Sequence, residues 1–485
     1  MIPALQNPRG PERANDRVQN HRWLLGAILA LAAFLRFFQL TEFPPGLSVD
    51  EAMDGNNALE IRETGHPQVF YPEDGGREGL YISAASLSVA AFGNRAWALR
   101  LPAAIFGLLT VWGLYLLAAE LVSIPTALLA AFFLATSFWH LVFSRMAFRA
   151  IAAPLFLVWG LYLMLAALRR ARAGRPFLGG IVLAGAVYGL GFYTYPAYRV
   201  TPLLVVAIWI AQGRRGPGIA AWTFAAASAA VAAPLAVYFV AHPGAFLERA
   251  GQVSVFSGPH PAVEIVLNCW RTARMLFTRG DRNWRHNVAW RAELFWPVAA
   301  CMLVGIWVAL ARHRVILLWL FLGMVPAVLA TECPHALRSI LMLPAVCVLA
   351  ALGAQQVHAW LARRIPVRCL QAAAAVILLA LSYEPYHTCF DAWVRNPKTA
   401  AAFDLPSTSL ARRIAAAPAG QLKLIVAADL TDMRLQPVMF LTGSYTARQS
   451  REKKIRYVTG QPADNGQCRP DVPPEAAAAI FCLGP

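Results

Sequence analysis

The sequence predicts an α-helical polytopic membrane protein that ends in a small soluble α/β domain. Of its 485 residues, 58% are hydrophobic and only 14% are charged, whereas soluble proteins carry about 25% charged residues. Apolar stretches close to the length of a bilayer-spanning helix recur along the chain. Beyond Tyr383 the composition becomes that of a water-soluble segment.

The first apolar segment, residues 23–40, follows a basic segment of residues 1–22 and is long enough to cross a bilayer. It has no small-residue cleavage site, so we expect an uncleaved first helix. The next run, 80–92, is too short to span and is expected to lie at the outer membrane face. Ten later spans are expected, about eleven in all, at 98–119, 126–143, 151–169, 177–194, 200–212, 219–240, 294–311, 315–331, 338–357 and 368–384.

The distribution of arginine predicts the orientation, because cytoplasmic loops carry an excess of Lys and Arg. If residues 80–92 do not span, four basic clusters fall on the same side as the N-terminus: 169–172, 214–215, 312–314 and 363–364. Residues 1–22 are then cytoplasmic and 23–384 form the membrane domain. Two long loops, 41–97 and 241–293, and the tail 385–485 lie outside.

The net charge of +17 does not indicate nucleic-acid binding, because arginines in short cytoplasmic loops account for much of it. The eight cysteines lack the paired spacing of metal sites. In the tail, Cys468 and Cys482 suit a disulfide, which would require an oxidising compartment. We expect strands at 421–428, 454–458 and 479–483, and a helix at 410–417.

Two adjacent carboxylates, Asp50 and Glu51, lie just beyond the first span. Carboxylates this close to a bilayer are unfavourable unless they are paired, hydrated or used. Ser48 and Glu51 match a capping box, in which the two side chains satisfy backbone N–H groups at a helix start. Glu51 can therefore be a cap or a participant in chemistry. Asp50 is not needed by the cap and is the predicted reactive carboxylate.

Arginines on the outer side violate the simple charge rule. Anionic lipid head groups or loop carboxylates are one explanation; a phosphorylated substrate is the other, because the planar guanidinium matches phosphate. The candidates for a donor phosphate are Arg77, Arg145, Arg149 and Arg338, and those for other substrate groups are Arg199, Trp284, Arg285, His286 and His335.

His286 and His335 could be metal ligands, but isolated histidines without a Cys or carboxylate at ligand spacing are more often hydrogen-bonded loop residues. A divalent cation held by Asp50 and Glu51 is kept as an alternative. No resident cofactor is expected.

Three motifs in sequence order resemble those of a known family: Pro44-Pro45-Gly46 before Asp50-Glu51, then Gly76-Arg77-Glu78-Gly79-Leu80-Tyr81, then Ala98-Leu99-Arg100-Leu101-Pro102. The family is the bacterial dolichyl-phosphate-mannose-protein-mannosyltransferase-like family, which includes lipid A aminoarabinose transferases and belongs to the GT-C superfamily. The segments 143–149, 193–199, 283–287 and 334–338 are also similar to bacterial members. The resemblance runs from about residue 20 to residue 355.

The resemblance implies a glycosyltransferase in the bacterial inner membrane with its active site facing the periplasm. It implies transfer of a sugar from a polyprenyl-phosphate carrier to a lipid, polysaccharide or protein acceptor, with Asp50 as catalytic carboxylate. In the aminoarabinose transferases a carboxylate precedes a lysine that meets the carrier phosphate. Here the order is reversed, with Arg77 as the implied phosphate ligand and Glu78 as a second acid.

Breaking a glycosyl phosphate builds positive charge on the sugar and negative charge on the phosphate, and external carboxylates and arginines supply partners for both. For a hydroxyl acceptor, Asp50 would act as general base with inversion. For a phosphate acceptor, it would orient the acceptor or sugar. A flippase for a lipid-linked sugar and a structural subunit of an envelope-assembly complex are the rival hypotheses. Ionisable residues concentrated at the outer ends, rather than at mid-membrane, favour the enzyme.

Overall fold

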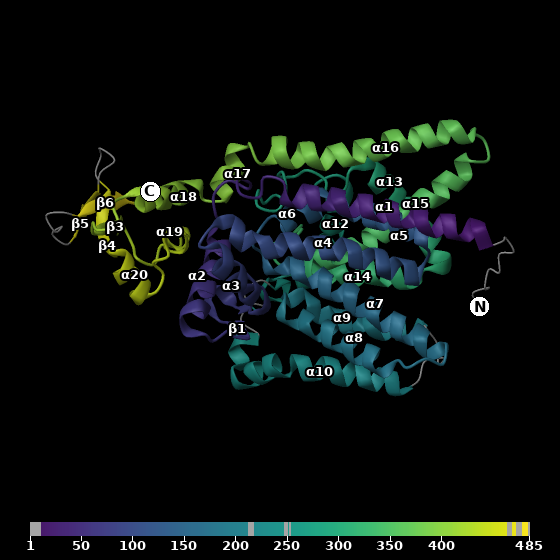
Figure 1. Cartoon of the computed structure of the whole chain (residues 1–485), viewed down its shortest axis with the longest axis horizontal. Helices are drawn as coiled ribbons and strands as arrows, with labels where there is room; N and C mark the ends of the chain where they lie inside the picture. Colours follow the sequence, from purple (N-terminus) through teal and green to yellow (C-terminus); the bar gives the residue numbers. More distant parts are fainter. Residues whose placement is uncertain are drawn as a thin grey trace.

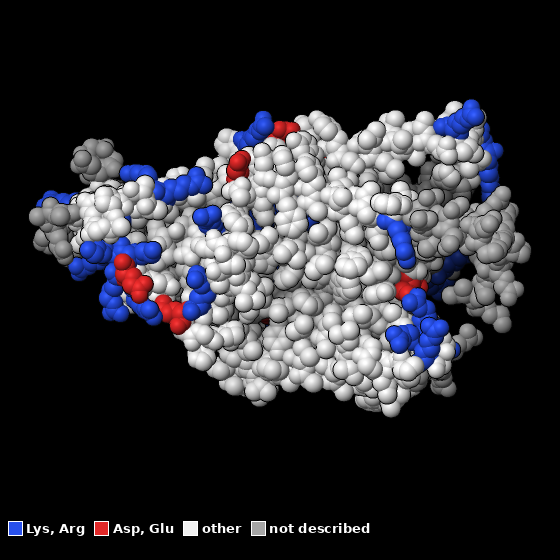
Figure 2. Space-filling view, in the orientation of Figure 1, with Lys and Arg blue, Asp and Glu red and all other residues white. Residues whose placement is uncertain are grey.

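The computed structural model describes residues 11–211, 218–246, 251, 254–462, 468–471 and 478–483. Figure 1 shows a bundle of helices along the long axis, with the N-terminus at one end and a small α/β unit at the other. On the face in Figure 2, charged side chains gather toward the two ends, and the surface over the middle of the helices is white. The hydrocarbon core of a bilayer requires an uncharged band of this kind.

Five described helical segments are long and apolar enough to cross a membrane, and a bent pair raises the number to as many as six. The five are α4 (Ala96–Leu121), η2 (Arg149–Ile151) with α7 (Ala152–Arg172), α10 (Gly218–Ala241), η6 (Ile340–Met342) with α15 (Leu343–Leu361), and α16 (Val367–His387) with the π-helical η7 (Thr388–Trp393). The bent pair is α5 (Ile124–Ala135) and α6 (Phe138–Ser144), which meet at 61°. A polytopic helical membrane protein is thus confirmed.

The remaining predicted spans coincide with helices that fall short of a full crossing by length or composition. These are α1 (Pro11–Phe37), α8 (Leu178–Leu190) with η3 (Gly191–Tyr193), η4 (Pro196–Val200) with α9 (Thr201–Ala211), α13 (Trp296–Arg312) and α14 (Arg314–Val328). The total of about eleven spans therefore stays a prediction.

Small residues bring the backbones of α13 and α15 into contact. A Cβ added to Gly305 would overlap the carbonyl oxygen of Leu349, and one added to Gly353 would overlap that of Cys301. Close approach at small residues is the usual way in which helices pack inside a membrane. The contact fixes the two helices side by side.

The first predicted external loop contains α2 (Val49–Thr64), β1 (Phe70–Tyr71), η1 (Glu73–Gly75), β2 (Arg77–Glu78) and α3 (Leu80–Phe92). The 13 residues of α3 match the short run predicted at 80–92. In Figure 1, α2 and α3 lie at the end of the bundle that carries the α/β unit. The second loop contains η5 (Val255–Ser257) and α12 (Pro261–Phe277), followed by an irregular segment up to α13.

The α/β unit contains α17 (Pro397–Ala402), α18 (Leu405–Ala416), β3 (Lys423–Ala427), α19 (Leu435–Thr442), α20 (Ala447–Lys453), β4 (Ile455–Pro462), β5 (Cys468–Pro470) and β6 (Ala479–Cys482). The strand order is β5-β4-β3-β6. β3 runs parallel to both β4 and β6, and β5 is antiparallel to β4. The predicted strands and helix are present, and Cys468 and Cys482 form a disulfide.

Helix α19 attaches the α/β unit to α2. The Asn56 amide donates to the Gln436 side chain at 2.7 Å and to its carbonyl at 3.1 Å. The ring of Phe440 lies against Gly55, where a Cβ would come within 2.6 Å of it. The helix that carries Asp50 is therefore packed between the bundle and the α/β unit.

Candidate active site

A cavity of about 620 Å³ lies where the two predicted external loops meet. Asp50 from the first loop and Arg285 from the second both line it. Further lining residues that the sequence singled out are Arg149, Arg199, His286, His335 and Arg338. The fold therefore brings seven of the predicted site residues to one cavity.

Asp50 lies in the first turn of α2, which begins after the N-cap residue Ser48. Its carboxylate pairs with the Arg285 guanidinium. Both side chains are partly exposed, 30% for Asp50 and 27% for Arg285. A carboxylate held in position and still reachable from the cavity can act on a bound substrate.

The contacts of Glu51 are those of a cap. Its carboxylate is fully buried, accepts from the Ser48 backbone at 3.1 Å and completes the capping box. It also accepts from Arg100 Nε at 2.8 Å and from the Ala147 backbone at 2.8 Å. Burial opposes the charged form, but Arg100 and these hydrogen bonds hold the pKa of Glu51 below its ordinary value. Glu51 is a structural carboxylate in this arrangement.

Arg77 and Glu78 also make buried internal contacts rather than line the cavity. Arg77 donates to Asp54 and to Asn57, both at 2.6 Å. Burial raises the pKa of Asp54, although Arg77 opposes the shift. Glu78 accepts from Arg149 Nε at 3.0 Å. Its second oxygen lies 3.6 Å from Arg199, so Glu78 orients two cavity arginines.

Arg145 and Trp284 are placed away from the lining as well. The fully buried Arg145 donates to the carbonyls of Leu35 at 2.9 Å, Arg36 at 3.0 Å and Phe43 at 3.2 Å. It therefore fixes the chain where α1 ends. The Trp284 carbonyl accepts from the Trp393 indole at 2.7 Å, which holds the loop beside Arg285 against the bundle.

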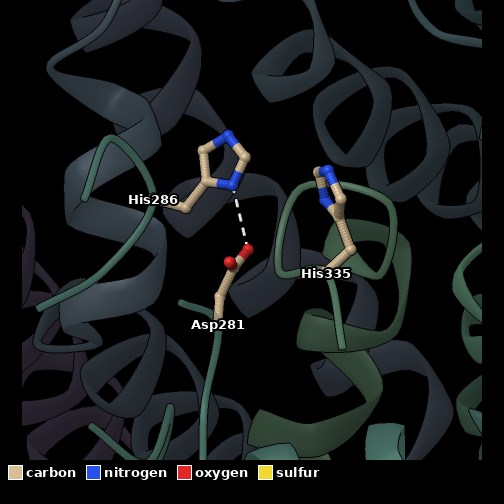
Figure 3. A group of neighbouring side chains, drawn as sticks. All are labelled: Asp281, His286 and His335. Carbon is tan, nitrogen blue, oxygen red and sulfur yellow. Dashed lines mark hydrogen bonds and ion pairs between the residues drawn. The ribbon is translucent and has the colours of Figure 1, made fainter. Parts of the chain in front are cut away.

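Asp281 is a buried site residue that the sequence prediction missed. Its carboxylate accepts from His286 Nδ1 at 2.9 Å, and Figure 3 shows the rings of His286 and His335 close to it. Burial alone would raise its pKa, but His286 and further donors lower the pKa of Asp281 to about 2. The statement that these histidines lack a nearby carboxylate was wrong. The Asp-x4-His spacing in one loop was the available signal.

The charges of the cavity suit an anionic ligand. Four lining arginines, Arg149, Arg199, Arg285 and Arg338, face three lining carboxylates, Asp50, Asp74 and Glu332. The remainder of the wall includes apolar side chains, among them Phe148, Val325, Leu329 and Leu337. The cavity therefore combines arginines that suit an anion, an apolar surface and carboxylates that a ligand can reach, among them Asp50.

Part of the chain matches the sequence model of a known family. Residues 80–240 match the sequence model of the family described as dolichyl-phosphate-mannose-protein mannosyltransferase. No curated protein matches the chain in sequence.

Solved structures share the fold at low sequence identity. ArnT from Cupriavidus metallidurans in the apo state has a TM-score of 0.55 at 14% identity, covering 89% of both chains. Its complex with undecaprenyl phosphate has a TM-score of 0.51 at 14% identity and the same coverage. The oligosaccharyltransferase AglB from Archaeoglobus fulgidus, in complex with an inhibitory peptide and a dolichol-phosphate, has a TM-score of 0.53 at 14% identity. That match covers 90% of this chain and 69% of AglB.

Proposed function

We propose that this chain is a membrane glycosyltransferase that uses Asp50 to transfer a sugar from a polyprenyl-phosphate carrier. Its residues 80–240 match the dolichyl-phosphate-mannose-protein mannosyltransferase family. The acceptor is reached from the outer, periplasmic face of a bacterial inner membrane. The observation that carries the proposal is that Asp50 and four arginines line one cavity.

The charge arrangement suits cleavage of a glycosyl phosphate. As the bond breaks, positive charge grows on the sugar and negative charge on the phosphate, so fixed charges of both signs stabilise the transition state. Arg338 and Arg199 bind the phosphate. Asp50 removes the proton of a hydroxyl acceptor, which attacks the anomeric carbon with inversion. Glu78 acts through Arg149 and Arg199, whose guanidinium groups it orients.

The isoprenoid tail of the carrier needs an apolar path from this cavity to lipid. The apolar side chains of α14 and of the following segment, among them Val325, Leu329 and Leu337, supply one wall. They lie in the same cavity as Arg338, so phosphate and tail can bind next to each other. Undecaprenyl phosphate bound to ArnT and dolichol-phosphate bound to AglB are ligands of this kind.

Placement of the cavity on the outer face has two supports. Eleven spans after a cytoplasmic N-terminus would put the tail outside, and a disulfide such as Cys468–Cys482 forms in an oxidising compartment. The α/β unit contacts α2 through Gln436 and Asn56, so Asp50 and the disulfide lie on the same side of the membrane.

The proposal is tested by sugar transfer with purified full-length protein in lipid nanodiscs. Radiolabelled polyprenyl-phosphate sugars are supplied as donors and extracted envelope fractions as acceptors. Asp50→Asn is expected to lower transfer by about 10²–10⁴-fold. Glu42→Gln, which changes an exposed carboxylate of the same loop, should retain activity. Undiminished transfer by Asp50→Asn would exclude the role of Asp50, and carrier transport without transfer would indicate a flippase.

A further inference from the structure

Three side chains from two separate loops form a buried cluster beside the cavity. Asp281 and His286 come from the loop before α13, and His335 comes from the segment between α14 and η6. Each offers one ligand atom, and these atoms all lie within 4.8 Å of one another. The three residues are 2%, 2% and 7% exposed. Two imidazoles and a carboxylate are a frequent ligand set for divalent transition metals.

The spacing is close to that of a coordination shell. Tetrahedral Zn²⁺ with bonds of about 2.0–2.1 Å separates its ligand atoms by about 3.3 Å. His286 Nδ1 and Asp281 Oδ2 are 2.9 Å apart. Small side-chain rotations therefore convert the cluster into three ligands. Zn²⁺ would replace the proton that His286 Nδ1 shares with Asp281, and that proton would be released to solvent.

His335 gives a second, independent observation. Its Nδ1 is buried and has no hydrogen-bond partner among the described residues. In Figure 3 its ring stands near the Asp281 carboxylate and next to the ring of His286, and the two ring centroids are 4.9 Å apart. A buried polar atom normally has a partner, because leaving it unpaired costs about 1–3 kcal/mol. A metal ion bound by this nitrogen would supply the partner.

The Asp281 carboxylate is already fixed by neighbouring backbone groups. The Asn283 N–H donates to Oδ1 at 2.8 Å, and the Ala336 N–H donates to Oδ2 at 2.8 Å. Outer hydrogen bonds of this kind orient metal ligands and are a common part of metal sites. Ala336 follows His335 directly, so the same contact joins the two loops that carry the ligands.

We propose that Asp281, His286 and His335 bind one divalent transition-metal ion, with Zn²⁺ as the ion that best suits the ligand set. Three protein ligands leave one coordination position for water or an anion. His286 and His335 line the cavity that contains Asp50. The metal therefore lies in the cavity wall and adds positive charge to it.

The test uses metal binding rather than activity, so it does not depend on the proposed function. Full-length protein is treated with a chelator, dialysed and titrated with Zn²⁺ alone, and bound zinc is measured by mass spectrometry. About one Zn²⁺ per chain is expected. His335→Gln and Asp281→Asn should weaken binding at least 10-fold. His66→Gln, which changes an exposed histidine elsewhere, should bind as the wild type does.

A spectroscopic arm keeps the proposal testable if these variants fold poorly. Co²⁺ added to the wild-type protein should give the visible bands of a four-coordinate ion, and Zn²⁺ should displace them. His335→Cys retains a ligand and should add a sulfur-to-metal charge-transfer band. Absence of Zn²⁺ and Co²⁺ uptake by the wild-type protein would overturn the site, as would unchanged binding in folded His335→Gln and Asp281→Asn.

Discussion

The Asp50 carboxylate pairs with the Arg285 guanidinium, although the two residues are 235 positions apart. The pair joins the first turn of α2 to the irregular segment before α13, and both partners line the same cavity. A partly exposed ion pair contributes little to stability. Its main effect is therefore to hold the carboxylate in one orientation toward the cavity.

Arg285→Gln is predicted to lower kcat for sugar transfer about 10-fold or more, because Asp50 loses the partner that orients it. The double variant Asp50→Asn/Arg285→Gln should be no slower than Asp50→Asn alone, since both changes disrupt one unit. Steady-state transfer kinetics measure both effects. Arg282→Gln is the matched control, because the Arg282 side chain is 63% exposed and its ion pair among the described residues is with Glu332, not Asp50. If the loss of kcat in the double variant equals the product of the two single losses, the two residues act independently and the role of the pair is contradicted.

Arg338 forms no ion pair with a carboxylate among the described residues, and its guanidinium makes a long hydrogen bond of 3.4 Å to the Glu332 carbonyl. Its guanidinium is therefore available to a phosphate. Arg338→Gln should raise the KM for the polyprenyl-phosphate donor about 10- to 100-fold, because a hydrogen bond to a charged group contributes about 1.5–3 kcal/mol. The KM of Arg338→Lys should lie between that of the wild type and that of Arg338→Gln.

The control for Arg338 is Arg279→Gln, since Arg279 is exposed and stacks on Trp290 instead of lining the cavity. Raised ionic strength should weaken donor binding in the wild type more than in Arg338→Gln. An unchanged KM in Arg338→Gln would show that the phosphate binds elsewhere.

The sequence predicted the long apolar helices, and three strands and one helix of the tail, because their signals are local. Apolar length marks α4 and α10, a short continuous apolar run marks β3, and alternation of apolar and polar residues marks β4. It also predicted the capping box, since Ser48 and Glu51 are three residues apart. A short apolar run with serines was enough to predict the bounds of α3, whose 13 residues are fewer than a bilayer crossing needs.

The partners of the buried charges could not be predicted, because they depend on contacts between distant segments. Arg77 was predicted to bind a phosphate, but both terminal nitrogens of its guanidinium donate to protein groups, one to Asp54 and the other to Asn57. Arg145 binds three carbonyls near the end of α1. Asp281 acquires its significance only when His335 is brought beside it. Residue type and spacing mark a charged residue as a candidate for a site. Its contacts in the folded protein determine its role.

Glu51→Gln is predicted to destabilise the protein by about 3–5 kcal/mol, because it leaves the buried Arg100 without a charged partner. The pKa of Glu51 in the fold is below its ordinary value of 4.5. Its contribution is therefore fully present above pH 4.5 and is lost as the pH falls through the lower folded value. Thermal unfolding in detergent, followed from neutral to acidic pH, measures this contribution of Glu51 to stability.

The Tm of the wild-type protein should fall in that acidic range. The Tm of Glu51→Gln should be lower at neutral pH and should depend less on pH in the acidic range. Glu42→Gln provides the exposed carboxylate control and should follow the wild type. Equal Tm values for Glu51→Gln and the wild type would show that the buried pair is not structural.

Gly55→Ala is predicted to loosen the contact between α2 and α19. A Cβ at Gly55 would lie 2.6 Å from the ring of the fully buried Phe440, so the ring or the helix must move. Overpacking of this kind costs about 1–3 kcal/mol. Faster hydrogen exchange over α19 and a lower Tm are expected. Because Asp50 lies at the start of the same helix, transfer activity should fall as well.

The second-site variant Phe440→Leu separates this contact from a general effect of the added methyl group. A smaller side chain at 440 makes room for the Cβ, so Gly55→Ala/Phe440→Leu should be more stable than Gly55→Ala and should recover part of its activity. Gly179→Ala in α8 is the matched control, because nothing lies within 4 Å of its added Cβ. Gly55→Ala as stable and active as Gly179→Ala would mean that the α/β unit does not position α2.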